Sequence, residues 1–339
     1  MQQGLRPCAI SPAENRHLPD TGLAGLDAAV ADQHTGVEEL SGESNARAHF
    51  RDLLELDDFP EDLLSATQHK LQASVDSHLH ATLFQGCAVR DKARLTTIAA
   101  PRASAWLWAI PNSNLGLAMQ RHEFVAATRY WLGCPLFDHT PVRCTCGALV
   151  DRYGDHLLGC SCGNLRIGRH DALCEVEYHA FRQDCGAVRR EQRVAGDSLH
   201  RPGDIYHPDF REGRPGYYDV TVRQSLQPCF LARASVTAGM AAAAGEQSKD
   251  GSHRARVEDV GGLSYPLVVE SLGLWSESSH DLLRQIAARA AVHCGLPLSR
   301  ASTNLYQQLS IKLWQFNAKM LLSRMQLGGC GFPMWDLAA

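Results

Sequence analysis

Two aspartates, Asp204 and Asp219, stand in short segments that otherwise have the composition of buried β-strands. Residues 201–222 read RPGDIYHPDFREGRPGYYDVTV, which places the two carboxylates fifteen positions apart. A carboxylate in such a segment costs several kcal/mol unless it is paired with a cation or binds a metal. A divalent metal held between two neighbouring strands would satisfy both groups, so we interpret the pair as a candidate metal site.

A metal site of this kind would suit phosphodiester cleavage, as in nucleases of the restriction-enzyme type. The metal, Mg²⁺ or Mn²⁺, polarises the phosphoryl oxygen and lowers the pKa of its bound water, and a lysine orients or activates that water. Lys249, the only lysine between residues 93 and 311, is our candidate for this lysine. Glu270, at the end of the apolar run LVVE, is a candidate further acid, and His207 is close enough to Asp204 to reach the same site.

A structural interpretation of the same residues is the alternative. Asp204 would then end a turn, Asp219 would pair with an arginine such as Arg201 or Arg223, and Lys249 would be solvated. The spacing of these residues leaves both interpretations open.

A second group of residues has the spacing of metal ligands. Residues 144–160 read CTCGALVDRYGDHLLGC, in which four thiol or imidazole groups follow the pattern C-x-C-x9-H-x3-C: Cys144, Cys146, His156 and Cys160. Zinc takes four tetrahedral Cys or His ligands, and two close ligands on a turn followed by two on the next element form a small closed loop around it. Cys162 could substitute for Cys160, and His170 is a spare nitrogen ligand. We predict a structural Zn²⁺ module, the alternative being buried cysteines in a reduced core.

Composition limits the class of protein. With 339 residues, 45% hydrophobic and 21% charged, the chain can form two modest domains or one domain with extensions. The net charge of −4 is uneven, because residues 1–60 hold 11 Asp/Glu and 4 Lys/Arg. Neither a secretory leader nor a membrane-length apolar run stands out, so we expect a nuclear or cytoplasmic protein with no membrane partner. Clustered cysteines in such a reducing compartment favour metal over disulfides.

The apolar pattern predicts helices on either side of a strand-rich centre. Helical spacing covers residues 50–83 (broken near Pro60), 91–99, 120–132, 169–185, 232–257, 281–292 and 302–325. Strand-like runs cover residues 188–194, 204–207, 217–222 and 264–271, with a hairpin turn at 213–216. The order helix, three strands, helix, strand implies an α/β core.

Several segments together resemble the C-terminal part of non-LTR retrotransposon polyproteins that carry a restriction-like endonuclease. The motifs, in the family's order, are ARLTTIAAPRASAWLWAIPN, HEFVAATRYWLGCPL, CTCGALVDRYGDHLLGC followed by GRHDAL, RPGDIYHPDFREGRPGYYDVTV, YPLVVESLGLW and LYQQLSIKLWQFNAKMLLSR. They extend from about Lys92 to Met325, roughly two thirds of the chain. No reverse-transcriptase signature such as a YADD-like run is present, so the chain resembles a detached fragment or a domesticated descendant of such an element.

The resemblance implies an α/β fold with a PD-(D/E)XK restriction-endonuclease-like core, a small zinc module and flanking α-helical segments. It implies a CCHC zinc motif at the four ligands named above, and an active site for Mg²⁺-dependent nicking of target DNA. The implied site residues are the metal-binding Asp204 and Asp219, with Lys249 and Glu270 as further candidates. Element RNA could be a second partner.

The sequence departs from the family's pattern at two points. The Pro-Asp of the signature appears as Pro202-Gly203-Asp204, with one residue inserted. Thr221 stands two residues after Asp219, where many related nucleases have lysine, so Lys249 would have to act from a helix.

These observations divide the chain into an acidic head (1–48), a helical region (49–140), the zinc module (141–168), the nuclease core (169–280) and C-terminal helices (281–339). Arginines near the motifs are candidate phosphate contacts: Arg166, Arg169, Arg189, Arg190, Arg193 and Arg201. Two other functions stay open at this stage. One is a nucleic-acid-binding remnant without catalysis, and the other is a host-adopted interaction protein.

Overall fold

The structure, a computed structural model, describes residues 68–137, 142–193, 201–211 and 213–325. The expected acidic head and the first part, residues 50–67, of the helical stretch expected over residues 50–83 lie outside the described residues. Contacts divide the chain into two units, residues 1–82 and 83–339, and the boundary falls within helix α3 (Gln68–Gly86). Within the described ranges, no helix is both long enough and apolar enough to cross a membrane.

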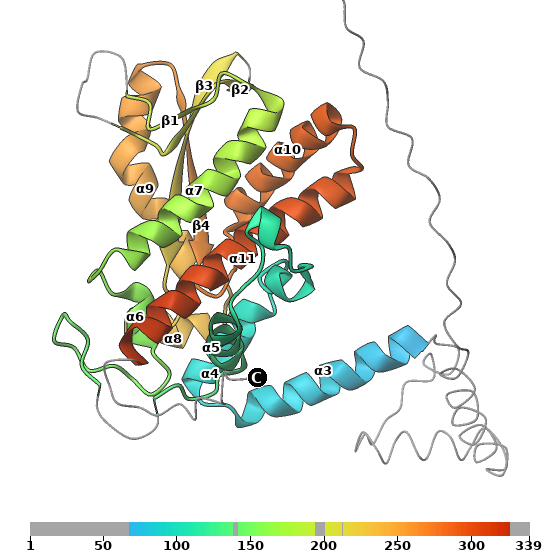
Figure 1. The fold of residues 1–339 in the computed structure, drawn as a ribbon, viewed down its shortest axis with the longest axis vertical. Helices are drawn as coiled ribbons and strands as arrows, with labels where there is room; N and C mark the ends of the chain where they lie inside the picture. Colours follow the sequence, from blue (N-terminus) through green and yellow to red (C-terminus); the bar gives the residue numbers. More distant parts are fainter. Residues whose placement is uncertain (1–67, 138–141, 194–200, 212, 326–339) are drawn as a thin grey trace, which may run out of the picture. The chain divides into compact units, whose positions relative to one another are not determined.

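A small mixed sheet lies at the centre of the second unit (Figure 1). Its strands are β1 (Arg189–Arg190), β2 (Ile205–Arg211), β3 (Arg214–Arg223) and β4 (Leu263–Glu270). They lie in the order β1-β2-β3-β4, the first three antiparallel and β4 parallel to β3. Since Ile205 pairs with Tyr218, the same register places Asp204 opposite Asp219.

Helices cover both faces of the sheet (Figure 1). Helices α7 (Leu165–Asp184), α10 (Glu277–Cys294) and α11 (Leu298–Met325) pack against one another, and α7 and α10 also contact the sheet. Helix α9 (Met240–Asp259) packs against β3 and β4. The chain thus has an α/β architecture, with the connection from β3 to the parallel β4 running through α9.

Side-chain alternation assigns the residues of β3 and β4 to the two faces. Tyr218, Val220 and Leu267 join the core formed with α7, α10 and α11. Their neighbours Tyr217 and Val268 pack against α9. Because both faces are covered, most positions of the two strands are apolar. Asp219, which has the parity of Tyr217, therefore projects its carboxylate toward α9.

A second core joins the remaining helices to the end of α11. It includes α4 (Val89–Ile98), α5 (Arg121–Leu132), α6 (Asp155–Gly159) and α8 (Pro228–Ala234). Trp314 and Tyr130 are fully buried there, and the rings of Trp106 and Trp314 lie 5.1 Å apart. Trp108, in contrast, is 80% exposed.

The elements follow the predicted order, and three differences concern the strands and the helix expected before β4. The strand expected over residues 188–194 is only two residues long in the described part of the chain. The hairpin turn comes earlier than expected, since β2 ends at Arg211 and β3 begins at Arg214. The helix expected over residues 232–257 is two helices, α8 and α9, separated at Ser235–Gly239, where Gly239 has φ of +81°.

Candidate active site and metal centres

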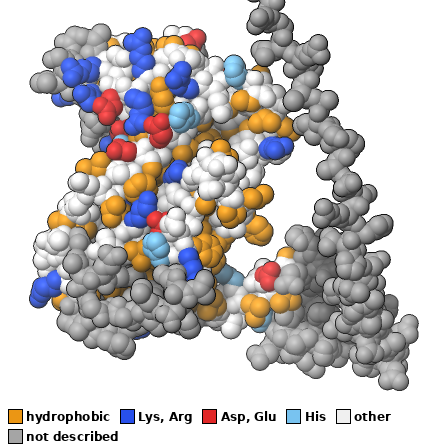
Figure 2. All heavy atoms as spheres, viewed as in Figure 1, with side chains coloured by type: hydrophobic (Ala, Val, Ile, Leu, Met, Phe, Trp, Pro, Cys, Tyr) orange, Lys and Arg blue, Asp and Glu red, His pale blue; other side chains and the backbone are white. Residues whose placement is uncertain are grey.

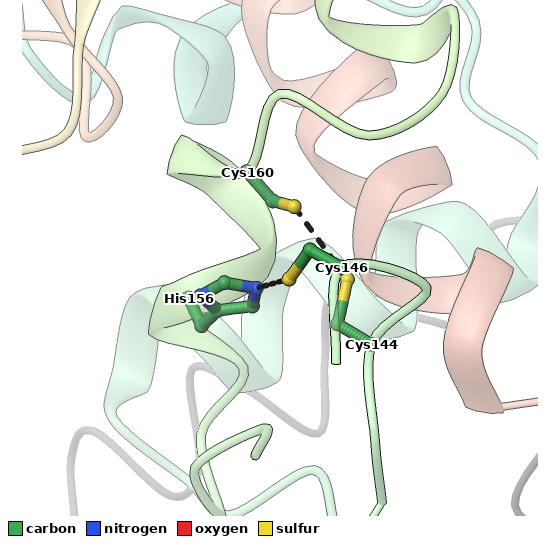
Figure 3. A group of neighbouring side chains, drawn as sticks. All are labelled: Cys144, Cys146, His156 and Cys160. Carbon is green, nitrogen blue, oxygen red and sulfur yellow. Dashed lines mark hydrogen bonds between the residues drawn. The ribbon is translucent and has the colours of Figure 1, made fainter. Parts of the chain in front are cut away.

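The four ligand atoms of the CCHC motif converge in the structure (Figure 3). Cys144 Sγ lies 3.5 Å from Cys160 Sγ, and Cys146 Sγ lies 3.2 Å from His156 Nε2. All four ligand atoms lie within 4.8 Å of one another. In a tetrahedral zinc site with Zn–S bonds of about 2.3 Å, neighbouring ligand atoms are roughly 3.5–3.8 Å apart. The group can therefore bind a metal such as zinc.

A tight hairpin and a one-turn helix position these ligands. Arg143 and Leu149 form an antiparallel bridge, and the turn between them, which carries both cysteines, is closed at Gly147 with φ of +87°. Helix α6 then presents His156, and Cys160 is its C-cap. The Asp151 carboxylate accepts hydrogen bonds of 2.8–3.1 Å from the backbone N–H groups of residues 153–156. This cap fixes the start of α6.

An ion pair joins the cysteine hairpin and α6 to the helical layer. Arg90 of α4 donates two hydrogen bonds, of 2.6 and 2.8 Å, to the Asp155 carboxylate at the start of α6. The buried Tyr130 hydroxyl donates a third, of 2.8 Å, to the same carboxylate. The ligand next in sequence, His156, is thereby held relative to α4 and α5.

The alternative zinc ligands are not part of this group. Cys162 is exposed, and its backbone N–H points at Cys160 Sγ at 3.4 Å, which supports Cys160 as the ligand. His170 lies in a different cluster, beside Asp204. Burial acts to raise the pKa of the Cys144 thiol, but hydrogen bonds from the Cys146 backbone and the neighbouring side chains lower it to about 6. A lowered pKa favours the thiolate, the form that binds metal.

Asp204 and Asp219 meet at the end of the central hairpin. Asp219 is 8% exposed, and one of its carboxylate oxygens lies 2.7 Å from Lys249 Nζ on α9. Asp204 immediately precedes β2, where its carboxyl group contacts that of Asp219 and accepts a 2.8 Å hydrogen bond from the Val220 N–H. The structure thus brings together the two acids and the lysine singled out in the sequence. Asp219 pairs with Lys249, not with Arg201, whose partner is Glu191.

The glycine inserted before Asp204 is explained by a close backbone approach. A Cβ at Gly203 would lie 2.8 to 3.0 Å from backbone atoms of Tyr218, closer than real side chains approach. The next residue is fixed on both sides, since the Asp204 N–H donates to the Tyr218 carbonyl at 2.8 Å and the Asp204 carbonyl accepts from Glu191 at 2.9 Å. Gly203 therefore lets the chain enter β2 with Asp204 held against β3.

His170 adds a second cation to the acid pair. Its Nε2 lies 3.1 Å from Asp204 Oδ2, and this hydrogen bond, opposed by burial, raises the pKa of His170 to about 9. Burial acts to raise the pKa of Asp204, but the hydrogen bond and charge of His170 outweigh it and lower the pKa. Burial raises the pKa of Asp219, assisted by Asp204 and opposed by Lys249. The two carboxylates of Asp204 and Asp219 are thus adjacent, with His170 on one side of the pair and Lys249 on the other.

Glu270, expected as a further acid, does not join this group. In the register of β3 and β4, Pro266 pairs with Asp219 and Glu270 pairs with Arg223, four positions along the strands, or about 13 Å. The fully buried Glu270 carboxylate accepts hydrogen bonds of 3.0 and 3.1 Å from the N–H groups of Ala241 and Ala242. Glu270 thus caps the N-terminus of α9.

His207, expected to reach the same site, also has a different position. It is 1% exposed and packs among Phe181 and Phe210. Its Nδ1 accepts the Asp209 N–H at 3.1 Å, and its Nε2 faces Asp184 at 3.4 Å. Because Nδ1 is an acceptor, the imidazole is neutral, and burial lowers its pKa. His207 joins the hairpin to the end of α7.

The six candidate phosphate contacts separate into three kinds. Arg169 is 1% exposed and donates to Asn317 at 2.8 Å and to the Leu158 carbonyl at 3.0 Å, so its expected contact with phosphate is wrong. Arg190 and Arg201 are engaged by Glu175 and Glu191. The remaining candidates are exposed: Arg166, Arg189 and Arg193.

The sequence interpretation missed one buried acid of α7. Glu177 is fully buried, and neither of its carboxylate oxygens has a hydrogen-bond partner among the described residues. Burial, together with the charge of Asp204, raises its pKa well above the ordinary value. The signal was present, because His170, Cys174 and Glu177 follow the i, i+4, i+7 spacing of one helix face.

A cavity of about 650 Å³ lies away from these residues, near the N-terminal ends of α9 and α10. Its lining includes Arg102, His280 and Tyr306 but none of the acids described above.

No protein-family model matches the chain, and the search of curated proteins found no match to it.

Proposed function

We propose that the chain is a metal-dependent DNA endonuclease with a PD-(D/E)XK-like core formed by α7, β1–β4 and α9, similar to the nuclease of non-LTR retrotransposons. Asp204, Asp219 and Lys249 are its active site. One observation carries the proposal, namely that these three side chains, distant in sequence, form a contiguous group at the end of the central hairpin.

The acid pair fits a divalent cation. Two adjacent carboxylates disfavour each other's charged form unless a cation lies beside them. Oxygen donors of this kind are the ligands that Mg²⁺ and Mn²⁺ take in phosphate chemistry. Bound at Asp204 and Asp219, such a cation would stabilise charge on the phosphate and lower the pKa of a bound water.

Neighbouring groups orient the two carboxylates and favour their ionised forms. The Val220 N–H and His170 hold Asp204 in its ionised form in one orientation. Lys249 comes from α9 and reaches Asp219. It therefore supplies the ammonium group that a lysine at the position of Thr221 supplies in many related nucleases. A lysine in this position can donate a hydrogen bond to the phosphate or orient the attacking water.

The rest of the chain would hold DNA against this group. Arg166, Arg189 and Arg193 are exposed and can neutralise phosphates. A zinc ion at the CCHC motif would be structural, because four protein ligands leave no open position for a substrate.

Nicking of supercoiled plasmid by the purified chain, with Mg²⁺ or Mn²⁺, tests the proposal. We expect nicking by the wild type and its loss in Asp219→Asn, which keeps the size of the side chain but removes the charge. The matched control is Asp209→Asn, an exposed aspartate on the same hairpin. Equal nicking by all three proteins would overturn the assignment. DNA retention in a gel shift without nicking by the wild type would favour a binding remnant instead.

A further inference from the structure

Helix α7 places a second set of metal-ligand atoms beside Asp204. Cys174 Sγ lies 3.6 Å from His170 Nε2, which lies 3.1 Å from Asp204 Oδ2. These three ligand atoms lie within 4.8 Å of one another. None belongs to the CCHC group.

The position of these residues follows from the helix. His170 and Cys174 are four residues apart and so point to the same face of α7. That face packs on the sheet, where Cys174 is fully buried and Asp204 is half-buried. Because the His170 side chain is about one-third exposed, a metal ion can reach this group of ligands from solvent.

One turn further along the same face lies the orphan acid Glu177. A fully buried carboxylate without a hydrogen-bond partner is costly in a folded protein and calls for an explanation, such as an ion. The charges of Asp204 and His170 both act on the ionisation of Glu177. A cation bound at the three ligands would favour the ionised form of Glu177, and that carboxylate would in turn stabilise the cation.

We propose that His170, Cys174 and Asp204 form a second metal site that takes a thiophilic divalent cation such as Zn²⁺, Co²⁺ or Cd²⁺. One sulfur, one nitrogen and one oxygen ligand suit borderline transition metals better than Mg²⁺, which prefers oxygen. Three protein ligands leave a position open for water or for a group from outside.

The site shares Asp204 with the acid pair, which has a consequence that rests on the proposed nuclease function. A thiophilic cation held by Cys174 and His170 competes for the Asp204 carboxylate. We therefore expect micromolar Zn²⁺ or Cd²⁺ to inhibit Mg²⁺-dependent nicking.

Metal stoichiometry of the full chain tests the second site directly. After dialysis against Co²⁺, we expect about two metal ions per wild-type chain, one of them at the CCHC group. Cys174→Ser and His170→Gln are each expected to retain about one. Cys185→Ser, which removes a thiol next to the C-terminus of the same helix, is the matched control and is expected to retain both.

A single Co²⁺ in the wild type, or two in both Cys174→Ser and His170→Gln, would overturn the second site. Because His170 is partly exposed, His170→Gln tests the proposal even if Cys174→Ser misfolds. A second bound Co²⁺ in a chain that fails to nick DNA would contradict the nuclease function while supporting the metal site.

Discussion

Lys249 and Asp219 are thirty residues apart in sequence and are joined by a 2.7 Å ion pair between α9 and β3. The buried carboxylate tolerates its charge partly because this ammonium group opposes the effect of burial on its pKa. The same ammonium group would lie beside the reacting phosphate. Lys249 therefore has a structural role and a proposed catalytic role, and measuring folding and nicking of one variant distinguishes them.

Replacing Lys249 by Gln is expected to lower the rate of plasmid nicking by about 100-fold, the smaller end of the effect of a positioned proton donor. Folding should persist, because the side chain is partly exposed and sits on the surface of α9. The control is Arg254→Gln, an exposed cation on the same helix, which should nick at the wild-type rate. Nicking by Lys249→Gln at the wild-type rate would remove Lys249 from the active site.

At the scale of elements, Glu270 shows how a strand residue can fix a helix. Its carboxylate accepts from two N–H groups at the start of α9, the helix that carries Lys249. We expect Glu270→Ala to lower the free energy of unfolding by about 2 kcal/mol, since two buried donors lose their acceptor. Glu270→Gln, which keeps one oxygen acceptor, should lose less.

Urea unfolding of both Glu270 variants measures this effect, and nicking per folded molecule distinguishes capping from catalysis. The capping role predicts that Glu270→Gln retains nicking. Complete loss of nicking in a stable Glu270→Gln protein would return Glu270 to the catalytic group.

The contact of the hairpin with α7 depends on a neutral His207. Protonation of His207 Nδ1 would remove the acceptor of the Asp209 N–H and leave two hydrogen-bond donors facing each other. The pKa of His207 is lowered in the fold, so the unfolded chain takes up this proton at higher pH. The free energy of unfolding should therefore fall as the pH drops below about 6.5, the ordinary pKa of histidine.

We expect His207 to account for about 1 kcal/mol of stability lost between pH 7 and pH 5. His207→Asn, which can keep an acceptor near the position of Nδ1 but does not titrate, should show a correspondingly smaller loss in urea unfolding at the two pH values. The same loss in both proteins would show that His207 does not control this dependence.

The order of elements followed from the sequence because apolar periodicity is a local signal, and the CCHC group followed because its ligands lie within seventeen residues. Glu270 was misplaced because strand register, and hence its distance of four positions from Asp219, depends on long-range pairing. Arg169 was misplaced because its partners lie on α11 and in the zinc motif. Burial of a charged side chain by distant elements leaves no local pattern.

At the scale of the whole molecule, affinity for DNA would depend on how the arginines are distributed. Figure 2 shows Lys and Arg side chains gathered, with Asp and Glu beside them, over the end of the molecule where α9 and β1–β3 lie in Figure 1. Arg169, by contrast, is buried between α7 and α11. The exposed arginines and the buried one should therefore respond differently to substitution.

We expect the triple variant Arg166→Gln, Arg189→Gln, Arg193→Gln to bind DNA more weakly and with a smaller dependence on salt. Each lost phosphate contact reduces the slope of log affinity against log salt concentration by about 0.9. Fluorescence anisotropy with a labelled duplex at several salt concentrations measures this slope.

The control is a matched triple variant in which exposed arginines of α5, α10 and α11 are replaced: Arg121→Gln, Arg284→Gln and Arg300→Gln. It removes the same net charge from the molecule. An equal loss of slope in the two triple variants would mean that binding responds to total charge and that the three proposed contacts are not specific.

Binding of the cleavage cation by Asp219 can be tested by changing the ligand atom of this side chain. Asp219→Cys replaces a carboxylate oxygen by a thiolate, which binds Mg²⁺ poorly but Mn²⁺ or Cd²⁺ better. We predict that Asp219→Cys fails to nick plasmid with Mg²⁺ and regains nicking with Mn²⁺, whereas Asp219→Asn is not rescued by Mn²⁺. Wild-type nicking by Asp219→Cys with Mg²⁺ would contradict the account.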